Sequence, residues 1–280
     1  MSTSKGADNV RWVVQDNLIA QGDLDAMKRA CVSLGVEFFP VKVIPFSDQI
    51  PDYPVDDKSN VYYGATQFIN KIHERYRPRG IFYSEFDFNM ANYIRQWGDR
   101  MLNAQAKKMK LHEFIERGDT LGDYWFIRPD ADDKSFDGAT MTFEETRIWF
   151  DKLVAVEELE RKLGNTPMVG KDTSIIAGPA YKVDKEWRNF IVNGRIVTST
   201  LYRKNFKLNK SAFDIPQSML SFVHERCMEY QIHKAFVMDV ALCGEEYYII
   251  ECGCINSAGF YHADVSKIIE AVSFEMSHPI

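Results

Sequence analysis

The chain has 280 residues and a mass of 32.4 kDa, and its 45% hydrophobic and 26% charged residues exclude a collagen, a disordered tail and a disulfide miniprotein. The formal net charge of −6 argues against a dedicated nucleic-acid-binding domain, which would usually be basic. At roughly 100–200 residues per domain, the length predicts two lobes or one elaborate domain.

The first hundred residues alternate strand and helix patterns. Apolar runs predict strands at 11–14, 37–44, 60–63 and 80–83, and helical spacing predicts helices at 23–34 and 66–76. Gly35 follows the first helix as a C-terminal glycine would. This alternation predicts a small α/β domain over residues 1–104.

The remainder of the chain, residues 105–280, is richer in strand patterns. Helical character runs from 91 to 116 with a break near 102–103, and later helices are predicted at 142–153, 218–231 and 264–274. Strands are predicted at 124–128, 174–176, 187–192, 196–202, 235–241 and 247–251. Asn193-Gly194 predicts a tight hairpin, and Thr142 with Glu145 forms a capping box. These patterns predict an α+β unit built on antiparallel sheets.

The N-terminal residues lack the apolar core of a signal peptide, and no apolar run approaches the roughly 18 residues of a membrane helix. We therefore expect a cytoplasmic protein without a membrane partner. The five cysteines form no Cys-x-x-Cys pair and are expected to be free thiols, and the six histidines form no metal-binding pattern.

Two carboxylates lie on consecutive predicted strands near the C-terminus. Asp239 lies within one strand and Glu251 at the end of the next, so antiparallel pairing could bring them together. With the amide oxygen of Asn256 they would form the all-oxygen site that Mg²⁺ prefers. Alternatively, Asp239 only caps a strand and Glu251 is a solvated strand end.

A second cluster begins where an apolar strand ends in Arg128. The polar loop that follows contains Lys134, Ser135 and Gly138, and such a loop can cover phosphates with its backbone N–H groups and its cation. It does not have the P-loop pattern. On composition alone, a plain surface loop is the favoured alternative.

A third cluster combines acidic and basic residues on a predicted hairpin. Period-two alternation places Glu186 and Arg188 on one face of a strand, and the hairpin brings Arg203 or Lys204 near the same edge. The alternative is an exposed face of ion pairs.

Taken in order, the three clusters resemble the ATP-grasp superfamily from about Trp125 to Tyr261. The segments Phe126-Ile-Arg-Pro-Asp130, Lys134-Ser-Phe-Asp-Gly138, Glu186-Trp-Arg188 and Asn256-Ser-Ala-Gly-Phe-Tyr261 are most similar to the clade named for one arginine and two lysines, which has phage and bacterial members. The resemblance implies an ATP-grasp fold preceded by a small α/β domain. If the chain is phage-encoded, its location would be the host cytoplasm.

The resemblance also implies roles for individual residues. It assigns nucleotide contacts to Arg128, Lys134, Ser135 and Gly138, the adenine to segment 178–182 with Tyr181 and Lys182, and the ribose to Glu186. It assigns the γ-phosphate and acyl phosphate to Arg188 with Arg203 or Lys204, and one or two Mg²⁺ ions to Asp239, Glu251 and Asn256. The chain departs from the common Glu-x-Asn pattern, because Gly253 occupies the asparagine position and Asn256 is the candidate third ligand.

These roles imply an ATP- and Mg²⁺-dependent, ADP-forming ligase that joins a carboxylate to an amine through an acyl phosphate. Its partners would be small-molecule or peptide carboxylates and amines, with no nucleic acid. The alternatives are an ATP-grasp kinase of a small-molecule hydroxyl and a nucleotide-binding protein without turnover. The substituted Gly253 favours the last of these, whereas Asp239, Glu251, Arg188 and Lys134 argue against it.

Overall fold

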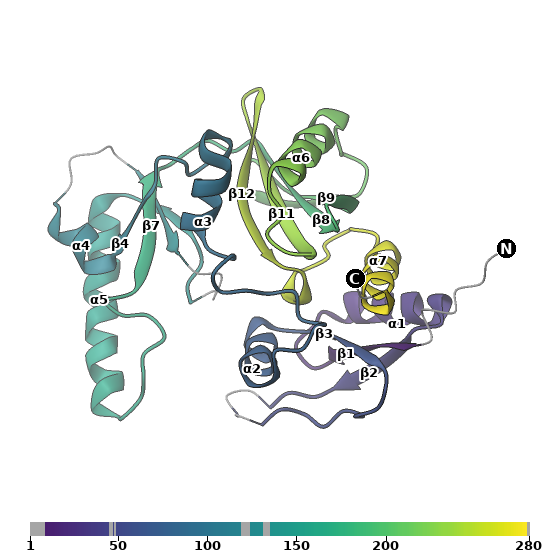
Figure 1. Ribbon diagram of the computed structural model, residues 1–280. Helices are drawn as coiled ribbons and strands as arrows, with labels where there is room; N and C mark the ends of the chain where they lie inside the picture. The colour runs from purple at the N-terminus through teal and green to yellow at the C-terminus, as the bar shows by residue number, and fades with distance from the viewer. Residues whose placement is uncertain (1–8, 45–46, 48, 119–123, 131–134, 279–280) are drawn as a thin grey trace. The chain divides into compact units, whose positions relative to one another are not determined.

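The computed structural model describes residues 9–44, 47, 49–118, 124–130 and 135–278, and Figure 1 gives its helices and strands. The chain divides into two compact units. The first comprises Met1–Ser84 with Val183–Ile280, and the second comprises Glu85–Lys182. The domain boundary that we predict near residue 104 therefore falls inside the second unit.

The N-terminal part of the first unit is a small parallel sheet with two helices. Strands β1 (Val10–Gln15), β2 (Glu37–Val41) and β3 (Ser59–Tyr63) lie in the order β2-β1-β3, with helices α1 (Gln21–Leu34) and α2 (Thr66–Tyr76) in the connections. The predicted helices and three of the four predicted strands are confirmed. Pro40 lies in β2, an edge strand, where a missing N–H is tolerated.

The fourth predicted strand, residues 80–83, is wrong. Tyr62 donates one backbone hydrogen bond to Gly80 (3.3 Å), but the Phe82 N–H is taken by the side chain of Asn256 (2.8 Å). A side-chain amide thus replaces the strand ladder, and the segment runs beside β3 without joining the sheet.

The C-terminal part of the first unit is a five-stranded antiparallel sheet in the order β10-β9-β8-β11-β12. Its strands are β8 (Lys185–Val192), β9 (Arg195–Lys204), β10 (Lys207–Ser211), β11 (Ala235–Cys243) and β12 (Glu246–Cys254). The predicted hairpin turn is confirmed, because φ is +50° at Asn193 and +71° at Gly194. Strand β10 is absent from the sequence-based prediction, because its polar residues carry no alternating apolar signal.

Two helices and a short 3-10 turn complete this unit. Helix α6 (Gln217–Glu229) packs on β9 and β11, the turn covers Ile255–Ser257, and α7 (Val265–Ser277) lies side by side with α1 (Figure 1). A shared core joins β1, α1 and α7 to the large sheet, and the indole N–H of Trp12 donates to Ser273 (3.0 Å). Each fully buried large side chain in such a core contributes about 1.5–3 kcal/mol.

The second unit contains a four-stranded antiparallel sheet in the order β4-β7-β5-β6. Its elements are α3 (Met90–Trp97), a 3-10 turn (Gly98–Arg100), β4 (Lys107–Lys110), α4 (Leu111–Glu116), β5 (Trp125–Pro129), β6 (Ala139–Met141), α5 (Phe143–Lys162) and β7 (Ser174–Pro179). The long helical region predicted from 91 to 116 is therefore wrong in its middle, where β4 lies. The capping box is confirmed by reciprocal hydrogen bonds between Thr142 and Glu145.

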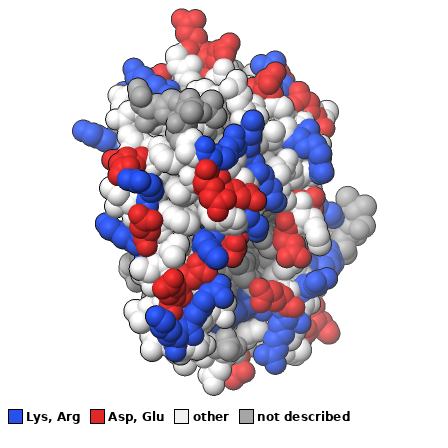
Figure 2. Space-filling view, turned by 90° about the vertical axis from the view of Figure 1, so that its left-hand side faces the viewer, with Lys and Arg blue, Asp and Glu red and all other residues white. Residues whose placement is uncertain are grey.

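The surface and the cysteines agree with the composition. In the view of Figure 2, basic and acidic side chains are interspersed rather than gathered by sign. All five cysteines are free thiols. Among the described residues, no helix combines the length and apolar character needed to cross a membrane.

Candidate active site

Strand pairing in the five-stranded sheet brings three predicted site residues together. Asp239 on β11 is the register partner of Arg188 on β8 and of Glu251 on β12. Directly opposite residues share one face of a sheet, so the predicted approach of the two carboxylates is confirmed. A bulge beyond this point pairs Val240 with Ile249 and leaves Ile250 as the extra residue.

Arg188 and Asp239 form a two-pronged ion pair. The Nε atom of Arg188 lies 2.9 Å from Oδ1, and Nη2 lies 2.8 Å from Oδ2. Nη1 donates to the carbonyl oxygen of Gly259 (3.3 Å). A guanidinium has five N–H donors, so two remain for a ligand once these three contacts with described residues are counted.

Burial sets the electrostatics of this pair. The Asp239 side chain is only 2% exposed, and burial raises the pKa of its carboxyl, with Glu251 adding to the rise and Arg188 opposing it. Burial lowers the pKa of Arg188 but the Asp239 charge outweighs it, so the guanidinium stays protonated. Arg188 therefore holds its positive charge directly against the Asp239 carboxylate.

Glu186 lies beside this pair and is held by β9. A bulge pairs Glu186 with Arg203 and Trp187 with Leu201, which makes Tyr202 the extra residue. The Tyr202 hydroxyl donates to Glu186 (2.7 Å) and lies 3.4 Å from an oxygen of Asp239, and Nη1 of Arg203 lies 3.3 Å from Glu186. Glu186 is buried, so its surroundings differ from the exposed ion-pair face considered as the alternative.

Tyr261 covers Arg188 from the C-terminal segment. Its ring stacks on Tyr202 with centroids 5.0 Å apart and an angle of 11° between planes. The Arg188 guanidinium carbon lies 5.2 Å from the Tyr261 ring and 5.7 Å from the Tyr202 ring. Tyr261 has a φ of +55°, a conformation that a bulky residue rarely adopts and that often marks a functional segment. Neither tyrosine carries a periodic signal in the sequence, so sequence reasoning missed both as site residues.

Among the described residues, two predicted site residues, Asn256 and Lys204, form no hydrogen bond or ion pair with the side chains of this cluster. The Asn256 side chain is buried, accepts from Phe82 N–H and donates to the carbonyls of Tyr62 (2.6 Å) and Gly80 (2.8 Å). Lys204 is exposed at the end of β9, opposite Lys185 and Lys207.

In the second unit, Arg128 lies on β5 and faces away from the helix-covered side of its sheet. Trp125 and Ile127 pack in the core beneath α4 and α5, and alternation directs Arg128 to the other face. A Cβ built on Gly138 would lie 3.2 Å from the Arg128 Cβ, so the loop approaches this residue closely. Ser135 is half-buried in the same loop, and Lys134 lies outside the described residues.

Lys108 on β4 is a candidate that sequence reasoning missed. Lys108 and Arg128 are both register partners of Ile176 on β7, one from each side, so the two cations share a face. Lys108 forms an ion pair with Asp130 (2.5 Å). The sequence pattern predicts helix for this segment, which hid the alternation that would have placed this lysine beside Arg128.

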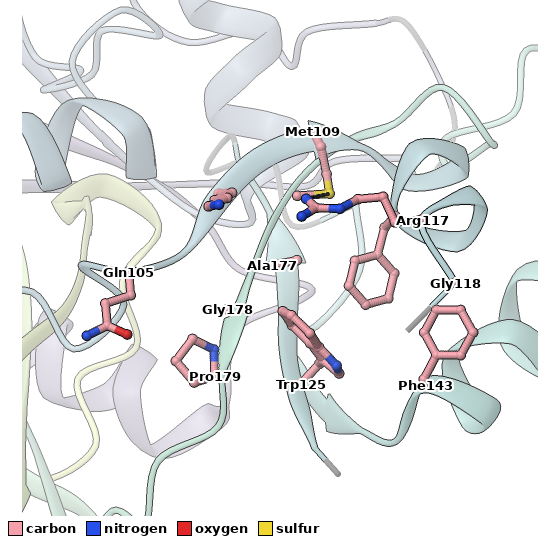
Figure 3. Close-up of a pocket in the computed structure, with 11 residues that line it drawn as sticks. Gln105, Met109, Arg117, Gly118, Trp125, Phe143, Ala177, Gly178 and Pro179 are labelled. Atoms are coloured by element: carbon pink, nitrogen blue, oxygen red, sulfur yellow. Dashed lines mark hydrogen bonds between the residues drawn. The ribbon is translucent and has the colours of Figure 1, made fainter. Parts of the chain in front are cut away.

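The segment predicted for adenine begins at the end of β7. Tyr181 and Lys182 are exposed, while a Cβ on Gly178 would lie 2.7 Å from the Ala106 Cβ, so glycine permits close packing there. Gly178 also borders a cavity of about 250 Å³ that includes Trp125 and Phe143 (Figure 3). This cavity is on the helix-covered side of the sheet, opposite the face of Arg128.

With this geometry in place, comparison of the sequence with protein families gives a match over residues 66–272 to an ATP-grasp domain, family 3 of the clade named for one arginine and two lysines. The chain belongs to this family. The resemblance seen in the sequence is thus confirmed, and so is the α+β ATP-grasp fold. A comparison with curated protein sequences gives no match.

Solved structures share the fold at low sequence identity. The ATP-grasp RimK domain protein from Sphaerobacter thermophilus DSM 20745 matches with a TM-score of 0.57 and 12% identity, covering 93% of this chain and 98% of that one. D-alanine–D-alanine ligase from Bacillus anthracis matches at 0.53 and 10%, covering 96% and 98%. The ATP-grasp ligase PsnB, in a complex with a precursor variant, Mg and ADP, matches at 0.54 and 8%, covering 96% and 99%.

Proposed function

We propose that this ATP-grasp protein is an ATP- and Mg²⁺-dependent ligase that joins a carboxylate to an amine and forms ADP. The observation that carries the proposal is the Arg188–Asp239–Glu251 arrangement, in which a half-buried arginine uses three of its five N–H donors on described residues and lies beside two carboxylates. Solved proteins of the same fold include ligases by name, one of them in a complex with Mg and ADP.

The donor set fits a magnesium ion. Asp239 and Glu251 would supply hard oxygen ligands from directly opposite positions on two strands. Among the described residues, no group of three or more acidic, histidine or cysteine side chains is arranged to hold a metal. Mg²⁺ commonly completes its shell with phosphates and waters, so two protein carboxylates suffice. Bound Mg²⁺ would supply neutralisation of phosphate charge, and we assign Asn256 a structural role instead.

We assign the remaining residues to positioning and charge. Arg188 and Arg203 would stabilise the transferring phosphoryl group, and Tyr202 would orient the Glu186 carboxylate for the nucleotide sugar. In the second unit, Arg128, Lys108 and the loop from Lys134 to Gly138 would bind phosphates, and segment 178–182 would contact the base. Lys204 is the alternative to Arg203.

In the proposed reaction, an oxygen of the substrate carboxylate attacks the γ-phosphorus of ATP, and the bond from that phosphorus to the bridging oxygen breaks to release ADP. An amine nitrogen then attacks the acyl carbon, and inorganic phosphate and a proton leave. The protein needs no covalent nucleophile, because its contribution is orientation and fixed positive charge.

A second candidate is a nucleotide-binding protein without turnover. Gly253 in place of the family asparagine favours it, together with the commitment of the Asn256 amide to backbone groups. A kinase of a small-molecule hydroxyl would use the same nucleotide residues without an amine.

The test is phosphate and ADP release from ATP and Mg²⁺ with pooled amino acids and peptides. Release that requires an amine supports the ligase, whereas ADP with a phosphorylated alcohol indicates a kinase. Tight ATP binding without turnover indicates the second candidate. We expect Asp239→Asn to lower Mg²⁺-dependent turnover by roughly 10²–10³-fold. Glu158→Gln, an exposed change on α5, is the matched control, and an Asp239→Asn variant with full activity would refute the metal assignment.

A further inference from the structure

The β9–β10 hairpin forms an exposed, cationic surface at one edge of the large sheet. Between Glu186 and Asp214 the sequence contains six basic residues and no acidic one, although the whole chain has a net charge of −6. Four of the six lie close to the turn of this hairpin: Arg203, Lys204, Lys207 and Lys210. All residues from 203 to 210 are exposed, so the three lysines face solvent, whereas Arg203 also contacts Glu186.

Apolar side chains are interleaved with the cations. Phe206 is 62% exposed, Leu208 is 66% exposed and Phe213, just beyond β10, is 98% exposed. Lysines alone would be an ordinary protection of a sheet edge against pairing. Large exposed apolar groups on the same short segment would instead promote association, and they are typical of an interaction site.

The two-residue turn of this hairpin has positive φ angles at both positions, and one of the two residues is aromatic. Asn205 has a φ of +47° and Phe206 a φ of +61°, and Lys204 pairs with Lys207 across them. In such two-residue turns the second position is usually glycine, because a side chain is disfavoured there. A phenylalanine at this position indicates that the exposed ring itself has a use.

The outer edge of β10 is available for a partner strand. β10 ends the order of its sheet, so its outer backbone groups have no neighbouring strand among the described elements. The surface also reaches the candidate active site, because Lys210 Nζ lies 5.7 Å from the ring of Tyr261, which covers Arg188. A substrate segment bound here would lie close to the reacting groups.

From these observations we infer that the β9–β10 hairpin binds an acidic, extended peptide segment of the substrate, which adds to the edge of β10. Charge complementarity and the open edge favour such a peptide. A second copy of the chain fits poorly, because two β10 edges would place lysines against lysines. Nucleic acid is disfavoured by the overall negative charge. The inference rests on the proposed ligase for the substrate's fate, but peptide binding itself needs no ATP.

The test measures binding of a fluorescent peptide of about eight alternating glutamates and valines, without ATP, by anisotropy. We expect binding that weakens as salt rises from about 50 to 200 mM, and a loss of about tenfold in Lys207→Glu/Lys210→Glu. The double variant Lys152→Glu/Lys162→Glu, which makes the same charge change on exposed α5 positions, should bind like the wild type.

Phe206→Gly separates recognition from folding. Glycine relieves the positive φ, so the variant should be at least as stable as the wild type, yet it should bind the peptide several-fold more weakly. Absence of peptide binding at about 1 mM, equal losses in both double variants, or tighter binding of a single-stranded oligonucleotide of similar charge would each overturn the inference. The peptide-binding assay contains no ATP, and ATP turnover is measured in a separate assay. Failure of peptide binding and failure of the ligase activity are therefore distinguishable.

Discussion

Two arginine–carboxylate clusters in the first unit differ in how completely the protein satisfies them. Arg11 on β1 bonds to Glu37, Asp56, Asn60 and the carbonyl of Pro54. With Lys58 also bound to Glu37, this cluster balances two cations against two carboxylates. It lies at the parallel sheet, and its closed set of contacts is typical of a group that stabilises the fold.

The cluster at Arg188 also pairs an arginine with a carboxylate. Among the described residues, Arg188 bonds to the Asp239 carboxylate and the Gly259 carbonyl, so it has fewer acceptors than Arg11. The pKa of Glu37 is lowered by its bond to Arg11, whereas burial raises the pKa of Asp239. We interpret the arginine with a closed set of acceptors as a group that stabilises the fold, and the arginine with N–H donors left over beside a shifted carboxyl as a candidate ligand-binding group.

The largest expected effect separates the clusters by activity. Arg188→Lys should lower kcat/KM for ATP-dependent phosphate release by roughly 10²–10³-fold, because a lysine cannot bond to Asp239 and a phosphate in the same planar geometry. Thermal unfolding of the same variant should change little, since the lysine still pairs with Asp239. Turnover within a few-fold of the wild type would remove the distinction between the clusters.

Arg11→Lys should show the opposite division. A lysine cannot reach the acceptors around Arg11 together, so we expect a loss of about 1–3 kcal/mol in the free energy of unfolding. The kcat of the folded variant should stay near that of the wild type. Urea denaturation gives the first quantity and steady-state kinetics the second, and a fall in kcat without a fall in stability would contradict a purely structural role.

Acidification should affect the Arg11 cluster through Glu37. Because its pKa in the folded protein is lowered from 4.5, chiefly by the bond to Arg11, Glu37 stabilises the fold above the unfolded pKa, and this contribution is lost as pH falls through the folded value. Glu37→Gln should therefore be less stable than the wild type at about pH 7, and the gap between the two should narrow at about pH 3. Denaturation midpoints of the two proteins at both pH values provide the measurement, and a constant gap would argue against the ion pair.

How much of the candidate site the sequence predicts differs from residue to residue, for physical reasons. Asp239 and Glu251 were found because a short polar turn indicates that their two strands pair, but the bulge at Ile250, which places them directly opposite each other, leaves no mark in the sequence. Tyr202 was missed because a bulge, which leaves no mark in the local pattern, turns it toward Glu186. Strand β4 was missed because its lysines are typical of a solvated helix until β7 pairs with them. Asn256 was assigned to the metal because sequence spacing does not reveal that its amide bonds to a backbone segment far earlier in the chain.

The smallest expected effect concerns the ring that covers Arg188. Tyr261→Leu should lower kcat about tenfold, because the guanidinium loses the aromatic face that holds its plane, and should leave the KM for ATP nearly unchanged. Tyr261→Phe keeps the stack on Tyr202 and should restore activity to within about twofold. If Tyr261 had only a structural role, both variants would lose stability equally, and kcat would not fall selectively while the KM stayed unchanged. Rescue by phenylalanine but not by leucine would assign Tyr261 to positioning Arg188, a need that Arg11, enclosed by its own acceptors, does not have.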